Sequence, residues 1–153
     1  MPTKLSQMIA ACYKRGGKVL ICGNGGLAAE SDHFAAELMG KYGKDVHIPA
    51  VSLTSNGALI TAIANDYGFQ YVFSAQAFTL GKPEDLLICM TTSQSSNILQ
   101  ASRITAFKTI LLNRDTVGGN DVAEIQENIL KLLHQVAREA KELISDGPNT
   151  CQS

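Results

Sequence analysis

The sequence predicts an α/β domain in which a parallel sheet of four or five strands lies between two layers of helices. Short apolar runs alternate with helix-forming segments along the chain, the order typical of such folds. The run Leu86–Met90 is apolar throughout, as expected of a strand buried on both faces. Thirteen glycines and only four prolines suit tight turns between strands and helices. With 153 residues, 45% of them hydrophobic, we expect one domain over 1–153.

The first elements follow from their boundaries. A glycine pair, Gly16-Gly17, ends an opening helix, because glycine favours the conformation that follows a helix C-terminus. A second helix begins after a glycine-rich turn, is rich in Ala, Glu and Leu, which are good helix formers, and ends at Gly40. The predicted elements up to residue 53 are a short helix whose end lies over 8–13, a strand over 18–22, a helix over 27–39 and a strand over 49–53.

The later elements end in a long amphipathic helix. Its apolar residues, from Val122 to Val136, recur at helical spacing and predict one buried face. The stretch 113–120 has neither strand nor helix character, so we expect a flexible loop there. The predicted elements are helices over 58–64 and 71–80, a strand over 86–90, a hydroxyl-rich loop over 91–96, a helix over 97–104, a strand over 109–112, a helix over 121–144 and a frayed polar tail over 145–153.

Composition excludes several classes of protein. A net charge of −1 provides no broad basic surface, so nucleic acid is not an expected partner. No apolar run approaches the roughly 18 residues of a membrane span, and no signal segment is evident. The four cysteines form no C-x-x-C pair, which favours reduced thiols. We therefore expect a soluble cytoplasmic protein without a membrane partner.

Two loops could hold an anion. The first, Gly23–Gly26, joins a strand to a helix and could direct free backbone N–H groups at a phosphate, although a plain tight turn has the same appearance. The second, Thr91–Ser96, carries five hydroxyl side chains in six residues before a helix, whereas capping that helix needs only one. In a doubly wound sheet both loops lie at the carboxyl edge, where ligands bind.

Two pairs of side chains could carry out proton transfer or bind a metal ion. His33 and Glu37 are four residues apart and share a helix face. Gln126 and His134 lie eight residues apart, nearly on one face of the last helix, although a lone histidine on such an apolar helix can also be a core residue. Together the four offer nitrogen and oxygen ligands that suit zinc. His47 lies in a polar linker, where we expect it to be exposed.

These residues belong to a longer pattern. It consists of Gly-Asn-Gly-Gly-x-Ala-Ala-x-x-x-His-Phe-Ala-Ala-Glu-Leu from residue 23, Ala-Ile-Ala-Asn-Asp-Tyr-Gly-Phe over 62–69, Val-Phe-Ser over 72–74, the hydroxyl-rich loop, and Ile-Gln-Glu over 125–127 with His134. From about residue 16 to 134 the chain resembles the phosphoheptose isomerases of the sugar isomerase (SIS) fold.

The resemblance implies an activity, a cofactor and an assembly. Such enzymes convert sedoheptulose 7-phosphate to D-glycero-D-manno-heptose 7-phosphate for lipopolysaccharide and other surface polysaccharides, and the resemblance implies a homotetramer with active sites built from more than one subunit. By the same resemblance, Glu37 and His134 are the acid–base pair. The implied zinc ligands are His33, Glu37, Gln126 and His134. The implied substrate-binding residues are Asn24, Gly25, Gly26, Asp66, Thr91, Thr92, Ser93, Ser95, Ser96 and Gln126.

The chain also departs from the family pattern. Leu27 stands where a serine is usual, so we expect the hydroxyl-rich loop to bind most of the phosphate. Compared with the family, this sequence is shorter in two places. Most of the N-terminal helical hairpin is missing, and after Asn113 no segment corresponds to the family's last strand. These departures keep open an alternative, a catalytically weak SIS module that binds a sugar phosphate or a protein partner as a regulator. The other departures are Lys41 for arginine, Asn56 for aspartate, Gln94 for glycine and Ser95 for asparagine.

Overall fold

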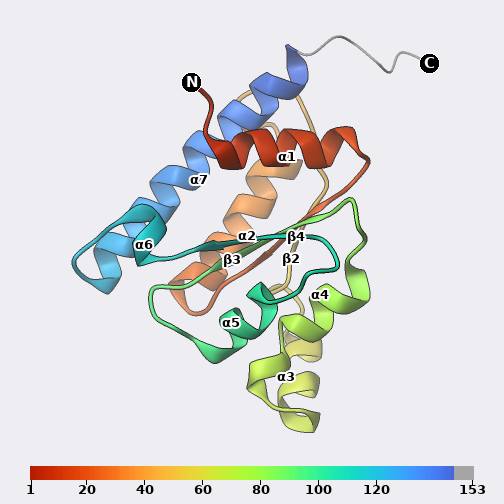
Figure 1. Ribbon diagram of the computed structural model, residues 1–153, viewed down its shortest axis with the longest axis vertical. Coiled ribbons are helices and arrows are strands. Elements are labelled where there is room, and N and C mark those ends of the chain that lie inside the picture. Colours follow the sequence, from red (N-terminus) through yellow and green to blue (C-terminus); the bar gives the residue numbers. More distant parts are fainter. Residues whose placement is uncertain (147–153) are drawn as a thin grey trace.

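The computed structural model, which describes residues 1–146, contains a parallel sheet of four strands in the order β2-β1-β3-β4 (Figure 1). All three neighbouring pairs are parallel, and Cys22 of β1 lies opposite Cys89 of β3. The predicted fold class is therefore confirmed. The strands are β1 (Val19–Cys22), β2 (Ala50–Ser52), β3 (Leu86–Met90) and β4 (Lys108–Leu112).

Side chains alternate between two cores, one on each face of the sheet. Ile21 of β1 and Ile88 of β3 enter one core, whereas their neighbours Leu20 and Leu87 enter the other. This follows from the two-residue period of a strand, which buries both faces when the strand is central. The helices α1 (Lys4–Lys14), α2 (Gly26–Met39) and α7 (Val122–Ser145) cover the first face. The helices α3 (Gly57–Asp66), α4 (Ser74–Leu80) and α5 (Ser96–Ser102) contribute to the second.

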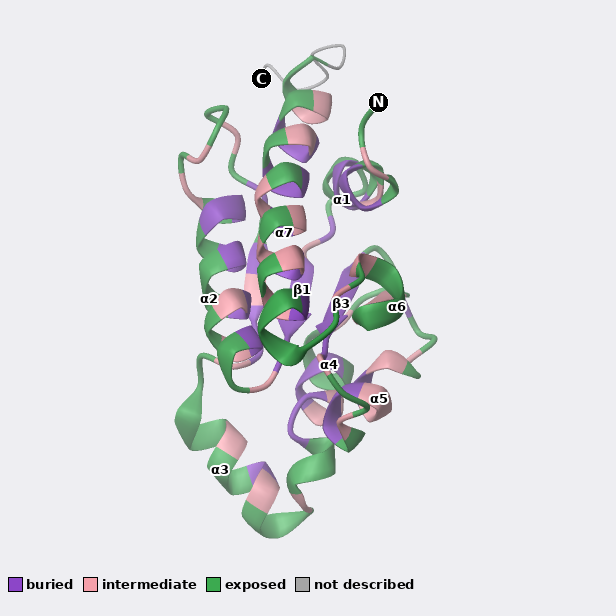
Figure 2. Ribbon diagram, turned by 90° about the vertical axis from the view of Figure 1, so that its left-hand side faces the viewer, coloured by how far each residue is buried: buried purple, intermediate pink, exposed green. Residues whose placement is uncertain are grey.

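Helices α2 and α7 pack against each other, and Figure 2 shows them side by side. Helix α3 lies at the end of the molecule far from the N-terminus and is exposed along most of its length, with Ile63 its single buried residue (Figure 2). Within residues 1–146, no helix combines the length and apolarity needed to cross a lipid bilayer.

Two expected elements were wrong in detail. The helix expected over 71–80 is instead a 3₁₀ turn, η1 (Phe69–Tyr71), followed by α4, because Val72 and Phe73 between them turn into the core. The loop expected over 113–120 contains the short helix α6 (Arg114–Val117). Asn113 and Thr116 form its capping box, in which each side chain bonds the backbone N–H of the other residue.

The structure also fixes the ends of three helices more closely than the sequence does. Helix α1 begins at Lys4, because the Thr3 side chain accepts from the backbone N–H of Ser6. Helix α5 ends at Ser102 and α7 at Ser145, beyond the start of the expected frayed tail. The rest of that tail, with Cys151, lies outside the described residues.

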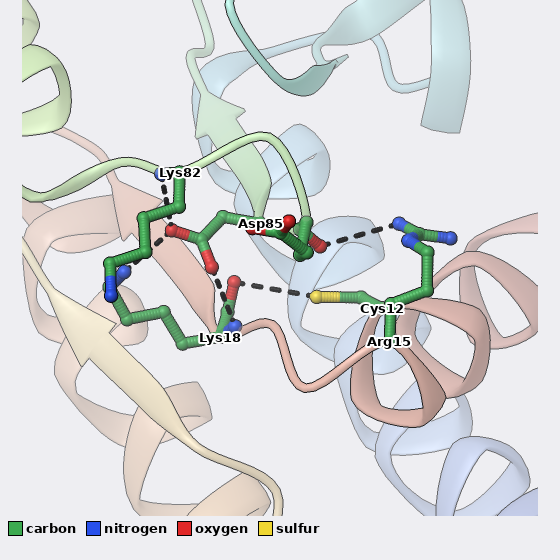
Figure 3. A network of polar contacts seen from close by, with 6 residues as sticks. Cys12, Arg15, Lys18, Lys82 and Asp85 are labelled. Carbon is green, nitrogen blue, oxygen red and sulfur yellow. Dashed lines mark hydrogen bonds and ion pairs between the residues drawn. The ribbon is translucent and has the colours of Figure 1, made fainter.

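A network around Asp85 fixes the amino edge of the sheet (Figure 3). The Asp85 carboxylate accepts from the backbone N–H and the ammonium of Lys18 and from the backbone N–H of Lys82, at 2.5–2.8 Å. Burial acts to raise the pKa of Asp85, but these hydrogen bonds outweigh it and lower the pKa below its usual value. The network therefore ties β1 to the turn before β3.

We expect Asp85→Asn to lower the free energy of unfolding by about 1–3 kcal/mol at pH 7, because a neutral amide cannot satisfy the same donors. A lowered folded-state pKa stabilises the protein above the unfolded pKa, near 4, and this contribution is lost as the pH falls through the folded pKa. The difference between Asp85→Asn and wild type should therefore shrink in urea denaturation below pH 4. Glu84→Gln is the control, since only the backbone carbonyl of Glu84 is used here.

Candidate active site

Three predicted residues meet where α2 and α7 pack together. The Glu37 carboxylate oxygen Oε1 lies 3.0 Å from Nε2 of His33 and 3.0 Å from Nε2 of His134. The Glu37 side chain is 10% exposed, while the imidazoles of His33 and His134 are 44% and 33% exposed, so the carboxylate lies deeper than its two partners. Both helices belong to one chain, so this part of the site is complete within a single polypeptide.

The packing of the two helices explains this meeting. Phe34 and Leu38 of α2, and Leu133 of α7, are buried in the same core and flank the site residues in sequence. The helices run in the same direction, since Gly26 lies against Gln126 near their starts and Glu37 against His134 further along. His33, Glu37 and His134 each stand next to one of these buried residues in the sequence, so they lie together where the two helices meet.

Two residues that the sequence analysis missed surround the pair of histidines. The Glu30 carboxylate lies 3.3 Å from Nδ1 of His33. The spacing of three residues on a helix was the available signal. The Tyr42 ring packs against the ring of His134, with centroids 5.8 Å apart. Glu30 thus holds the His33 ring from the side opposite Glu37, and Tyr42 packs along the His134 ring.

The three ligand atoms fit a divalent metal ion. A ring nitrogen of His33, a carboxylate oxygen of Glu37 and a ring nitrogen of His134 all lie within 4.8 Å of one another. Imidazole nitrogen and carboxylate oxygen are common zinc ligands, and three protein ligands leave a position for a substrate or water. Glu30 adds the usual outer partner, a carboxylate that accepts from the second ring nitrogen of a ligating histidine. The donor set is therefore appropriate for zinc.

A buried lysine stands behind this site. Lys141 of α7 is fully buried and donates from Nζ to the backbone oxygen of Gly40, at 2.6 Å, where α2 ends. Burial lowers the pKa of Lys141, and the nearby charges of Glu37 and Asp45 oppose that effect. A cation at the C-terminal end of a helix is favourable to the helix dipole. The bond joins the ends of the two site helices.

The glycine-rich loop has the conformation of a close backbone approach. Gly25 has φ +56°, which disfavours a side chain, and a Cβ at Gly26 would lie 3.0 Å from the Gln126 side chain. Gln126 therefore lies at the loop end of α7, just over two turns from His134. Its role as a zinc ligand stays a prediction, and its position beside Gly26 suits the substrate-binding role.

The hydroxyl-rich loop is internally bonded. Thr91 accepts from the backbone N–H of Ser93 and donates to the Ser93 carbonyl, and the hydroxyls of Ser93 and Ser95 lie 3.2 Å apart. Ser93 and Ser96 are exposed, and Thr92 and Ser95 are half-buried. The loop follows β3, beside the loop that follows β1, as predicted from the order of the elements.

The two loops are joined by Asn24 and Asn97. Each side-chain amide donates to the other's oxygen at 2.8 Å. Asn24 was a predicted substrate-binding residue, whereas Asn97 was not identified, because no local pattern reveals a partner 73 residues away. Asp66, another predicted substrate-binding residue, lies exposed at the end of α3 and accepts from the Asn65 side chain.

The departures from the family pattern have different structural settings. Leu27 is 2% exposed and belongs to the core, so in this chain the side chain packs, and a serine there would leave a cavity. Asn56 caps α3 by accepting from the Leu59 N–H. Lys41 and Gln94 are exposed, as is His47.

Three of the cysteines are free thiols, as expected. Cys22 and Cys89 are buried on neighbouring strands with their sulfur atoms 3.6 Å apart. Their hydrogen bond and their burial hold the pKa of Cys22 well above its usual value. A raised pKa makes the Cys22 thiol a poor nucleophile, and both cysteines are buried, so they act in packing below the two loops.

The fold and the site define the class of SIS-domain proteins. The SIS domain model matches residues 3–104. Phosphoheptose isomerase 1 of Campylobacter jejuni is 37% identical over 88% of this chain and 82% of its own length. A phosphoheptose isomerase of Neisseria meningitidis serogroup C is 35% identical over 93% and 83%. The chain belongs to the phosphoheptose isomerase family.

Solved structures agree with that assignment. The phosphoheptose isomerase of Neisseria gonorrhoeae superposes with a TM-score of 0.82 at 34% identity, covering 90% of this chain and 83% of that one. A phosphoheptose isomerase from Francisella tularensis gives a TM-score of 0.83 at 31% identity, with the same coverage.

Proposed function

We propose that this protein is an aldose–ketose isomerase that converts sedoheptulose 7-phosphate to D-glycero-D-manno-heptose 7-phosphate. The observation that carries the proposal is Glu37 set between two imidazoles in a chain of this family. The product would supply heptose for surface polysaccharides such as lipopolysaccharide, and the reaction would take place in the cytoplasm.

The reaction moves a carbonyl group from C2 to C1 of the sugar. A base removes a proton from C1, the carbonyl oxygen at C2 gains a proton, and an enediol forms. The O1 proton then leaves and a proton is added at C2, so that the aldehyde forms with no net change in atoms. Glu37 is placed to act as the base, and His134, 3.0 Å from it, to move protons to and from the oxygens.

The proposed cofactor is zinc, which one nitrogen each of His33 and His134 and one Glu37 oxygen would hold, with Gln126 as a predicted fourth ligand. The other Glu37 oxygen and the other His134 nitrogen would then serve in proton transfer. When bound, zinc would supply positive charge that stabilises the enediolate oxygens. Glu30 would hold the His33 ring in the tautomer that directs Nε2 toward the ion.

The phosphate end of the substrate is proposed to bind at the hydroxyl-rich loop, together with backbone groups of Gly25 and Gly26. The loop carries several hydroxyl donors beside the glycine-rich turn, and phosphate is well bound by such clusters. Gln126 lies beside Gly26 and could bind the part of the sugar next to the phosphate.

We expect the double substitution Ser93→Ala with Ser96→Ala to raise KM about tenfold or more while kcat changes less than about threefold. Contacts to a remote phosphate serve binding more than the chemical step, which sets this pattern. Steady-state kinetics on the sugar phosphate measure it, with Ser102→Ala on the same helix as control. A fall in kcat at unchanged KM would contradict the phosphate assignment.

The proposed assembly is a homotetramer in which one site draws on more than one subunit. Along α2, Glu37 lies about three turns, or ~16 Å, beyond Gly26, which is long for one heptose phosphate to span. Large apolar side chains are exposed beside α3 and α4, with Tyr67 72% and Phe78 76% exposed. They line a groove of about 870 Å³, and exposed aromatic surface of this kind is typical of subunit contacts.

An isomerisation assay with sedoheptulose 7-phosphate, with and without added zinc, tests the function. We expect product formation that depends on zinc. Binding of the sugar phosphate without turnover in either condition would instead favour the regulatory module. The retained Glu37, His33 and His134 arrangement is what makes that alternative less favoured.

A further inference from the structure

The side chains of Asn24 and Asn97 form a reciprocal pair between the two loops. Asn24 follows β1 in the glycine-rich loop, and Asn97 is the second residue of α5, behind the hydroxyl-rich loop. Nδ2 of each donates to Oδ1 of the other, at 2.8 Å in both directions. Asn97 is 1% exposed and Asn24 is half-buried. Burial of a polar side chain as deep as that of Asn97 destabilises the fold unless the side chain forms hydrogen bonds.

A third bond fixes which way round the pair sits. The backbone N–H of Ile98 donates to Oδ1 of Asn97 at 3.0 Å. Both lone pairs of that oxygen are then in use, one for Ile98 and one for Asn24. Turning the Asn97 amide over would set its NH₂ against the Ile98 N–H, so Nδ2 of Asn97 must face Oδ1 of Asn24.

The orientation of Asn97 therefore sets that of Asn24. In its two bonds to Asn97, Asn24 accepts through Oδ1 and donates one of the two N–H groups of Nδ2. One N–H of Asn24 is left, on a side chain that is still partly accessible. Asn24 thus offers a donor, and a ligand that meets it must present an acceptor oxygen.

We propose that Asn97 is a positioning residue that acts through Asn24. It holds the glycine-rich loop against the hydroxyl-rich loop and directs one Asn24 N–H at an acceptor oxygen of the sugar phosphate. This inference rests on the proposed function for the nature of the ligand. It assigns a role to a buried residue that the reaction itself does not use.

A double-mutant cycle on KM tests the coupling. Asn24→Ala should raise KM about tenfold, the scale of one hydrogen bond to a charged or strongly polar acceptor. Asn97→Ala should raise it by a similar factor, with kcat within about threefold in both. Because both changes remove the same oriented donor, the double variant should exceed Asn24→Ala by less than about twofold. Independent effects, which would multiply to about a hundredfold, overturn the proposal.

Asn97→Asp covers the case in which the alanine variant does not fold. Aspartate keeps the shape and can still accept from the Ile98 N–H, but it has no N–H to give to Asn24. We expect its KM to rise about tenfold, while Ser102→Ala, elsewhere on α5, keeps the wild-type value. A wild-type KM in a folded Asn97→Asp variant overturns the proposal.

Side-chain amide exchange provides a readout that needs no activity. In ¹⁵N-labelled protein, one Nδ2 proton of Asn24 should exchange slowly in wild type and rapidly in Asn97→Ala, which lacks the Oδ1 that accepts it. Asn56, whose oxygen is used but whose NH₂ is exposed, is the reference for rapid exchange. Equal exchange of Asn24 and Asn56 in wild type overturns the pair itself. Slow exchange in a wild-type protein without isomerase activity would refute the proposed function while leaving the Asn24–Asn97 pair intact.

Discussion

Replacing Glu37 with glutamine should lower kcat by about a hundredfold or more, and replacing His134 with glutamine should do the same. Glutamine keeps the size of glutamate but cannot accept the C1 proton, and it cannot carry protons as an imidazole does. Both side chains lie on packed helices whose buried apolar residues are untouched, and glutamine fills the space of the buried Glu37, so the fold should survive. Turnover of sedoheptulose 7-phosphate and the thermal midpoint together measure the outcome.

Matched controls separate these losses from general damage. Glu142→Gln makes the same chemical change at an exposed position of α7, and His47→Gln does so at an exposed histidine in the linker after α2. Both should keep wild-type turnover. Wild-type turnover in Glu37→Gln and His134→Gln would instead refute the assignment and support the regulatory module.

Metal analysis should find close to one zinc ion per chain in protein purified without chelator, and far less in His33→Ala. Loss of one of three protein ligands removes much of the binding energy, and a zinc ion present at 100 times its Kd stabilises the fold by about 2.7 kcal/mol. The thermal midpoint of wild type should therefore fall on treatment with a chelator, while that of His33→Ala should not.

Glu30→Gln tests the outer partner of the same ion. Glutamine can still accept from the His33 ring but lacks the charge that makes the imidazole a stronger ligand, so zinc affinity should fall about 10- to 100-fold. Asp32→Asn is a nearby control, because Asp32 bonds Thr54 rather than a site histidine. Unchanged zinc affinity in both Glu30→Gln and His33→Ala would rule out this metal site.

Local patterns predicted the layers and half of the site. The fold class could be predicted from the uniformly apolar run at β3 and from helices that end at glycines. Both signals depend only on residues close together in the sequence. The His33–Glu37 pair followed from helical spacing alone. By contrast, the approach of His134 to Glu37 depends on how α2 and α7 pack, which periodicity does not specify.

Other details depended on tertiary contacts that no local pattern reveals. The break between η1 and α4 arises because Val72 and Phe73 turn inward. Leu27 could be compared with a serine in a motif, but only its position in the core shows that its side chain packs and does not bind ligand. The Asn24–Asn97 pair likewise joins residues that are adjacent only because β1 and β3 are neighbours.

The parallel packing of α2 and α7 places the two histidines and Glu37 within a single chain. Affinity for zinc is then a property of each polypeptide and should not change with protein concentration. Turnover, if the hydroxyl-rich loop is supplied across a subunit contact, should instead fall per chain on dilution below the dissociation constant of the assembly. A dilution series that records bound zinc and specific activity together would show two curves that part, and the concentration at which they part would measure the strength of the assembly.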